Sequence, residues 1–255
     1  MKNYVFDIET VGLPTDQLQA IMPAFDPETV KTGNYGSEKA AEKIEKVRQE
    51  QFNRFMRDAA LSALTGQVAM IGIRSEAGDT YIFSLPDEKT IIAEWLKLFE
   101  SEIDRGGHWI GFNISNFDLP FLIRRAWFHR LRIPYGIVRG RYITSHFTDL
   151  LTLWIGSEHA GRFEVSLNDL AKFFAIGIKS ANGADFGELL RYKPEAAREY
   201  LANDLEITWK VAEAMGALKR PLASDLAEPT GPPDPGPAID PIEEPQSEPA
   251  GIQFY

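Results

Sequence analysis

The segment KNYVFDIE, residues Lys2–Glu9, predicts a buried β-strand around which the other elements assemble, because it is rich in aromatic and β-branched residues. Two acids, Asp7 and Glu9, interrupt the apolar run. Side chains alternate along a strand, so both acids point to the same face, roughly 6–7 Å apart. Burying two neighbouring like charges is costly unless a cation lies between them, and oxygen ligands suit Mg²⁺ or Mn²⁺. The strand therefore predicts part of a metal site.

The composition is that of an ordinary globular chain. Its 255 residues are 44% hydrophobic and 25% charged, which is consistent with one domain. We expect a cytoplasmic protein that does not enter a membrane, because there is neither an N-terminal apolar signal region nor an apolar run long enough to span a bilayer. The absence of cysteine excludes disulfides, thiolate catalysis and zinc–thiolate sites. No close metal-ligand spacing occurs among the histidines, which are His108, His129, His146 and His159.

The C-terminal segment differs in composition from the preceding chain. Between Pro221 and Tyr255 there are nine prolines, seven acids and no bases, which leaves a net charge of −3 on residues 1–220. We therefore predict a folded domain over residues 1–218 and a disordered, acidic, proline-rich tail over residues 219–255. Because the body is nearly neutral, the acidic total does not exclude a nucleic-acid substrate. The apolar tip of the tail predicts either a docking peptide for a protein partner or a plain disordered terminus.

Strands and helices interleave along the folded part. A helical insertion of about residues 14–64 follows the first strand, and its main helix is predicted from Ser37 to about Leu64. This helix either packs on the body or narrows access to the site. We expect further strands at 67–74, 80–85, 108–112 and 143–150, and further helices at 88–103, 118–130, 166–174 and 194–218. The order predicts an α/β domain with a mixed sheet covered by helices.

Two more acids stand where site residues are expected. Asp118 lies in GFNISNFDLPFL, where a strand ends and a helix begins. Asp204 lies in the last helix four residues after Tyr200, so both side chains project from one face of that helix. Each acid alone is typical of a helix cap or a solvated charge. Together with Asp7 and Glu9, they predict one carboxylate pocket.

These motifs resemble a known family. FDIET, then NISNFD, then YLAND are similar, in order and interval, to the three motifs of the DEDD superfamily of 3′–5′ exonucleases, in the subgroup with tyrosine in the third motif. The chain resembles DnaQ-like proofreading domains and stand-alone relatives of the exonuclease domain of family B DNA polymerases over roughly residues 1–215. The sister subgroup has histidine where this chain has Glu199. The tail and the length of the insertion depart from the family pattern.

The resemblance implies a ribonuclease-H-like fold with a mixed five-stranded sheet, whose second strand is antiparallel, and four acids at one edge. It implies two divalent ions, Mg²⁺ or Mn²⁺, bridged by Asp7. Glu9 and Asp204 would hold the ion that binds the attacking water, and Asp118 would support the other. Tyr200 would orient the water. The two ions would lower the pKa of that water and neutralise the charge that develops on the phosphodiester.

Further residues are candidates for substrate contact. The resemblance implies that Thr10 and Leu13 lie near the terminal nucleotide. It also makes Asn113 and Phe117 candidates for substrate binding, at positions that shape the second motif. Structural roles are equally consistent with all four positions. No acid occurs between Leu119 and Thr148, whereas six arginines and several aromatics do. Such a stretch, beginning with Arg124 and Arg125, suits a path for a single strand through phosphate attraction and base stacking. The alternative is that Trp127 and Phe128 are core residues and that the arginines form a solvated face.

The expected activity is a metal-dependent 3′–5′ exonuclease that releases nucleoside 5′-monophosphates from single-stranded DNA in replication or repair. One alternative is the same hydrolysis of RNA, because no residue recognisably reads the 2′-hydroxyl. Another is a nuclease-like binding module that is recruited through its tail.

Overall fold

The computed structural model describes residues 2–84, 87–134, 137, 146–156, 165–177 and 186–219. Contacts divide the chain into two units, Met1–Arg220 and Pro221–Tyr255. The second unit lies outside the described residues, so the disorder and the docking role of the tail stay predictions. Within the described part of the chain, no helix combines the length and the apolar character that a membrane crossing requires.

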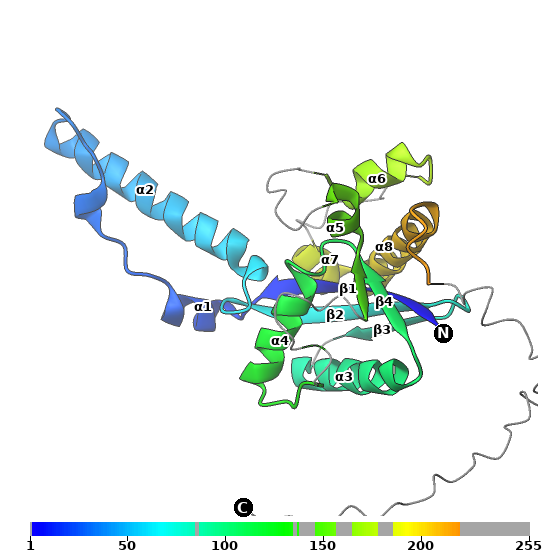
Figure 1. The fold of residues 1–255 in the computed structure, drawn as a ribbon. Coiled ribbons are helices and arrows are strands. Elements are labelled where there is room, and N and C mark those ends of the chain that lie inside the picture. Colours follow the sequence, from blue (N-terminus) through cyan, green and yellow to red (C-terminus); the bar gives the residue numbers. More distant parts are fainter. Residues whose placement is uncertain are drawn as a thin grey trace, which may run out of the picture. The chain divides into compact units, whose positions relative to one another are not determined.

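The described residues form one mixed five-stranded sheet in the order β3-β2-β1-β4-β5 (Figure 1). The central strand β1 pairs antiparallel with β2 and parallel with β4, while β2–β3 is antiparallel and β4–β5 is parallel. This confirms the predicted sheet with its antiparallel second strand. The strands are β1 (Asn3–Gly12), β2 (Gly66–Ser75), β3 (Thr80–Ser84), β4 (His108–Gly111) and β5 (Phe147–Asp149).

The two faces of β1 meet different helices. Phe6 and Ile8 pack in a core cluster with helix α3 (Glu88–Asp104) and helix α4 (Asp118–Phe128). Val5 packs on the other side of the sheet, in a cluster with helix α8 (Pro194–Ala214). Because side chains alternate along the strand, Asp7 and Glu9 share the face of Val5 and therefore lie toward α8.

Helix α8 lies unusually close to the sheet. Gly72 on β2 is paired with Asp7, and a Cβ atom at Gly72 would lie 2.8 Å from both Leu201 Cγ and Leu205 Cδ1 of α8. A side chain there would push the helix outward. Glycine at this position therefore lets α8 carry Asp204 down to the acids of β1.

The insertion between β1 and β2 is helical, as predicted, but its helices differ in extent. It contains α1 (Thr15–Ile21), the 3₁₀ helix η1 (Pro27–Thr29), α2 (Ser37–Asp58) and the 3₁₀ helix η2 (Ala59–Leu61). The predicted end of the main helix at about Leu64 is wrong, because α2 ends at Asp58 and η2 follows it. The chain then turns into β2, and the Thr65 hydroxyl donates a hydrogen bond to Ala59 O at 2.8 Å in this turn.

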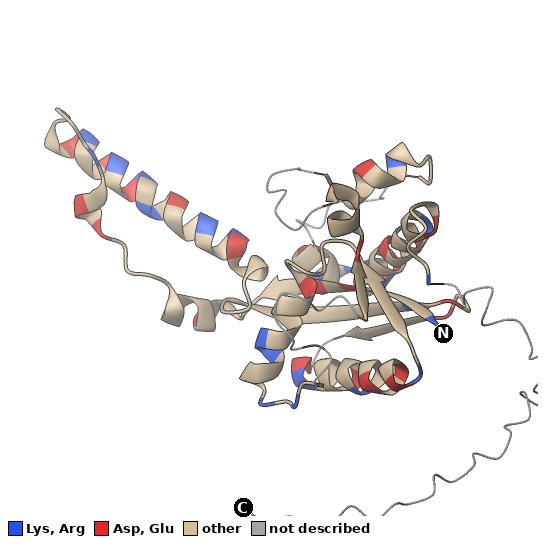
Figure 2. Cartoon of the chain, viewed as in Figure 1, with Lys and Arg blue, Asp and Glu red and all other residues tan. Residues whose placement is uncertain are grey.

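Helix α2 extends away from the sheet, with both charge signs along its surface (Figures 1 and 2). None of its residues is buried. Its half-buried side meets the preceding part of the insertion, where Arg48 lies 5.1 Å from the Phe25 ring centroid and Lys43 Nζ donates to Lys31 O. The insertion is therefore an arm that covers its own apolar stripe, and η2 at its base contacts β1.

The remaining helices follow the sheet. Ser166 forms a capping box at the start of α6 (Leu167–Phe173), which confirms the helix predicted at 166–174. The predicted strand at 143–150 is shorter where the structure describes it, because Asp149 caps α5 (Leu150–Ile155). Helix α7 (Phe186–Tyr192) was not predicted.

The buried His108 on β4 predicts a pH dependence of stability. Its side chain is 2% exposed, its Nε2 lies 2.8 Å from Thr148 Oγ1, and burial lowers its pKa from 6.5 to about 4. Between these values the unfolded chain binds a proton that the folded chain excludes. The free energy of unfolding should therefore fall as the pH drops from about 6.5 to about 4, by roughly 3 kcal/mol from this residue.

Urea unfolding at several pH values checks this. His108→Gln keeps a donor for Thr148 but cannot titrate, so its free energy of unfolding should fall less over the same window. Parallel curves for the two proteins would contradict the assignment.

Candidate metal centre

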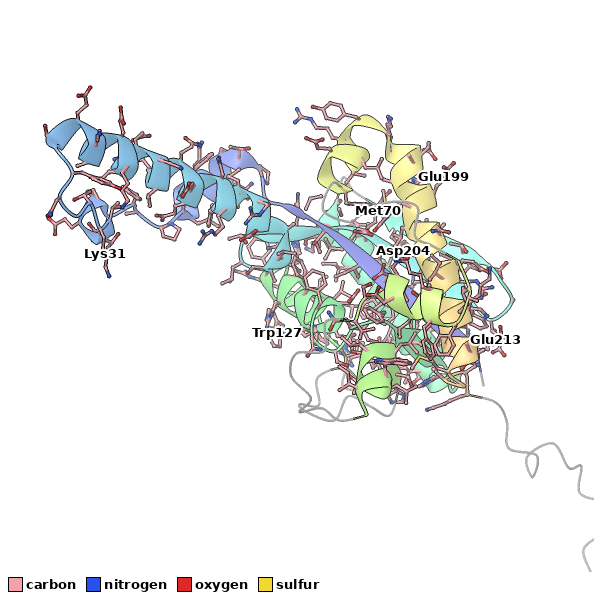
Figure 3. All side chains as sticks on the ribbon, turned by 90° about the horizontal axis from the view of Figure 1, so that it is seen from above. Lys31, Met70, Trp127, Glu199, Asp204 and Glu213 are labelled. Carbon is pink, nitrogen blue, oxygen red and sulfur yellow. The ribbon has the colours of Figure 1, made fainter. Side chains whose placement is uncertain are left out.

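Three carboxylates gather at one edge of β1. Asp7, Glu9 and Asp204 each offer an oxygen, and these oxygens all lie within 4.8 Å of one another. Asp7 and Glu9 are half-buried on β1, whereas Asp204 is 1% exposed on α8. Figure 3 shows Asp204 in the middle of that helix, beside the sheet. Three of the four predicted acids therefore meet, although nearly two hundred residues separate Glu9 from Asp204 in the chain.

Asp118 borders this cluster from a third element. It is the first residue of α4, is 3% exposed, and accepts a hydrogen bond from Ile8 N at 3.0 Å. Burial, followed by the charge of Asp7, raises its pKa well above the ordinary value. The fourth predicted acid thus lies beside Asp7, and the two carboxylates repel each other when both are ionised.

Asp149 holds the loop that leads to Asp118, although its place in the sequence did not predict a site residue. Its carboxylate accepts hydrogen bonds from Asn113 N and Ser115 N, both at 2.8 Å, and from Leu151 N at 3.0 Å. Asn113 has a φ of +60°, so this loop bends sharply after β4. The sequence signal for this role of Asp149 was its position at the end of a strand and directly before a helix. The same position equally predicts an ordinary N-cap.

Tyr200 is 6% exposed and lies one turn before Asp204 on α8. Its ring centroid is 6.1 Å from that of Phe186, the first residue of α7. The structure therefore brings the tyrosine and the aspartate onto one helix beside the sheet. The proposed orientation of a water molecule by its hydroxyl stays a prediction.

The four candidate substrate-binding residues, Thr10, Leu13, Asn113 and Phe117, differ in their contacts within the protein. Thr10 Oγ1 donates to Ala60 O at 2.7 Å, which ties β1 to η2. Leu13 is half-buried and donates its N–H to Thr65 O. Asn113 is fixed by Asp149, as described above. Phe117 is half-buried against Phe121. Their contacts with a substrate stay predictions.

Arg125 requires a correction. It is 3% exposed, and its guanidinium donates to Glu88 at 2.9 and 2.6 Å and to Ala63 O at 3.2 Å. Burial alone would raise the pKa of Glu88, but hydrogen bonds from Arg125 and His129 hold it below its ordinary value. Because Arg125 is bound inside the protein, it is not part of the proposed substrate path. Arg124 is exposed, whereas Arg139 and Arg141 lie outside the described residues.

The donor set fits a divalent metal ion. All the ligand atoms are carboxylate oxygens, which Mg²⁺ and Mn²⁺ prefer. Two of the acids are almost fully buried, and a neighbouring charge raises the pKa of one of them. A cation among them would remove this repulsion, so the site suits a bound metal better than a structural cluster of acids.

Comparisons with known proteins agree with this fold. A family model described as the RNase_H superfamily matches residues 58–203, more than half of the chain; the range includes Asp118 and Tyr200 and ends just before Asp204. The fold is similar to that of the family B DNA polymerase from the hyperthermophilic archaeon Pyrobaculum calidifontis, with a TM-score of 0.52 and 18% identity over 84% of this chain. The chain spans about a quarter of that polymerase chain, 24%. No curated protein sequence matches it.

Repulsion among the acids predicts how stability responds to metal. Adding Mn²⁺ should raise the melting temperature of the wild type, because the ion binds only the folded carboxylates. Asp7→Asn removes one of the repelling charges, so it should raise the metal-free melting temperature by a few degrees, equivalent to about 1–2 kcal/mol, and lose most of the response to Mn²⁺.

Differential scanning calorimetry with EDTA or Mn²⁺ measures both effects. Glu213→Gln, on the exposed side of the same helix as Asp204, serves as the matched control and should respond like the wild type (Figure 3). A full Mn²⁺ response in Asp7→Asn would show that the ion binds elsewhere.

Proposed function

The chain belongs to the RNase_H superfamily, and from this membership and its carboxylate site we propose that it is a nuclease, specifically a metal-dependent 3′–5′ exonuclease that releases nucleoside 5′-monophosphates from single-stranded DNA in replication or repair. The observation that carries the proposal is the meeting of Asp7, Glu9 and Asp204 within 4.8 Å, with Asp118 beside Asp7. The three motifs that resemble the tyrosine subgroup of the DEDD exonucleases supply these acids.

Asp7, Glu9, Asp118 and Asp204 would hold two divalent ions, Mg²⁺ or Mn²⁺. When bound, such ions supply a water of lowered pKa and positive charge for the phosphodiester oxygens. The acids come from a strand and two helices whose backbones are fixed by the sheet and by packing. They therefore need little rearrangement to bind a cation, which favours catalysis because the site is organised before the substrate arrives.

The other residues of the site position the substrate and the water in this proposal. Tyr200 would orient the attacking water through a hydrogen bond with its hydroxyl. Thr10 and Leu13 lie near the terminal nucleotide, while Asn113 and Phe117 shape the segment that carries Asp118. In this proposal the terminal phosphodiester must reach the metal ions, so a paired end must first be unpaired and unstacked. Unpairing costs a few kcal/mol, so single strands are preferred.

The rival functions remain distinguishable. The presence of all four acids and Tyr200 favours an active enzyme over a nuclease-like binding module. Hydrolysis of RNA is the remaining alternative, and nuclease assays on DNA and RNA of equal sequence separate the two substrates.

Replacing Asp7 by Asn should abolish hydrolysis. The substitution keeps the size of the side chain but removes the central charge among the ligands, so we expect a loss of roughly 10³-fold or more. Release of nucleotides from labelled single-stranded DNA, with Mg²⁺, Mn²⁺ or EDTA, measures the effect. Glu213→Gln should hydrolyse at the wild-type rate, and near-wild-type turnover by Asp7→Asn would refute the site.

The direction of digestion is a separate test. A 5′-labelled strand should shorten progressively from its other end, and a 3′-terminal phosphate should slow the reaction far more than a 5′-terminal one. Gel electrophoresis of a time course shows the products. Early release of the 5′ label as a mononucleotide would contradict the proposed polarity.

A further inference from the structure

The outer side of α4 carries exposed aromatic residues. Trp127 is 57% exposed and Phe128 is 67% exposed, so neither is a core residue. Arg124 lies three and four residues before them and is also exposed, which puts all three side chains on one side of the helix. Trp127, near the end of α4, lies at the margin of the body (Figure 3). Exposed tryptophan and phenylalanine side by side are unusual on a surface without a binding role.

The segment from α4 to Pro134 is also rich in arginine, although Asp87 of the neighbouring helix start lies close enough to His129 to interact with its charge. No acid occurs from residue 119 to residue 134, whereas Arg124, Arg130 and Arg132 are exposed there. Glu100 approaches only Arg132, at 4.0 Å, and both of these side chains are largely solvated. Figure 2 shows basic residues on one part of α4 and in the segment that follows it. A surface of this kind attracts a phosphate backbone.

The base of the insertion extends the apolar part of this surface. Leu61 is 66% exposed and Leu64 is 82% exposed. Arg125 joins the two regions, because its guanidinium donates to Ala63 O and lies 4.3 Å from the Phe128 ring centroid. The buried ion pair of Arg125 with Glu88 therefore holds the Ala63–Leu64 turn against α4.

The distance from the acids suits a strand of nucleotides. Asp118 is the first residue of α4 and Trp127 lies nine residues later, which is about 14 Å along a helix. At the stacked spacing of about 3.4 Å per nucleotide, this corresponds to roughly four nucleotides. One helix thus carries both an acid of the proposed catalytic site and a stacking surface, and the distance between them matches the length of a short single strand.

We propose that this surface, the α4 face (Arg124, Trp127 and Phe128 with Leu61 and Leu64), binds single-stranded nucleic acid several nucleotides from the 3′ end. Bases stack on Trp127 and Phe128, and Arg124 contacts a phosphate. The inference rests on the proposed function, because it assigns the path of that substrate. It makes α4 a determinant of affinity for longer strands.

The corner between α7 and α8 is the competing surface and provides a matched control. Tyr192 there is 69% exposed, with the Arg191 guanidinium 5.5 Å from its ring centroid. Unlike the α4 face, this corner also carries exposed acids, namely Glu188, Glu195 and Glu199. Mixed charge attracts phosphates weakly, so the α4 face is favoured.

Equilibrium binding without turnover tests the proposal. In the Asp7→Asn background with Mg²⁺, the anisotropy of 5′-labelled oligothymidylates of three and twelve nucleotides gives the affinities. Trp127→Ala with Phe128→Ala should weaken binding of the 12-mer on the order of tenfold or more and leave the trimer unchanged. Trp127→Phe should retain most of the affinity. Arg124→Ala should reduce the slope of log K against log salt by about 0.7.

Tyr192→Ala should leave both affinities unchanged. Loss of 12-mer affinity in Tyr192→Ala but not in the α4 variants would overturn the proposal. Equal affinities of all variants for the 12-mer would also overturn it and would favour a protein partner for the α4 face. Thermal unfolding verifies the fold, and Trp127→Gln replaces the double variant if that unfolds. If the wild type hydrolyses DNA but binding of the 12-mer does not depend on Trp127, only the proposal for the α4 face is refuted. If binding depends on Trp127 but the wild type does not hydrolyse DNA, only the proposed exonuclease activity is refuted.

Discussion

The structure depends on the alternation of side chains along β1. One side of the strand buries Phe6 and Ile8 under α3 and α4, and the other side presents Asp7 and Glu9 toward α8. The strand is therefore anchored by its apolar side while its acids stay available. Gly72 on the neighbouring strand then decides how closely α8 approaches, and hence whether Asp204 reaches the acids of β1. The fold and the carboxylate site therefore both depend on the alternation of side chains along β1 and on its pairing with β2.

Backbone hydrogen bonds to acids fix the surroundings of the site. Asp118 accepts the N–H of Ile8, which joins α4 to the central strand next to Asp7. Asp149 accepts two N–H groups of the loop before α4, and Glu88 accepts Val68 N together with Arg125. Hydrogen bonds of this kind hold the pKa of Glu88 below its ordinary value, and truncating any of these acids would leave backbone donors unsatisfied. These contacts hold α4, which carries Asp118, and the base of the insertion in place beside the central strand.

The sequence predicted the features that follow from local rules and missed those that depend on tertiary packing. The alternation of residues in β1 and the position of Asp118 at the end of a strand indicated that these acids are site residues. The four-residue interval between Tyr200 and Asp204 indicated that both lie on one face of a helix. Arg125 was misassigned, because its ion pair with Glu88 arises only when α3 and α4 pack together. The end of α2 was missed because a tertiary turn into β2 stops the helix, and α7 was missed because its seven residues carry a weak periodic signal.

Anomalous diffraction from crystals of the wild-type protein soaked in Mn²⁺ tests the central claim most directly, namely that the four acids form a two-metal centre. The account predicts two anomalous peaks roughly 3.5–4 Å apart, with Asp7 bound to both and Glu9, Asp118 and Asp204 completing the oxygen ligands. Absence of Mn²⁺ from this edge of β1 at a concentration that occupies other sites in the crystal would contradict it.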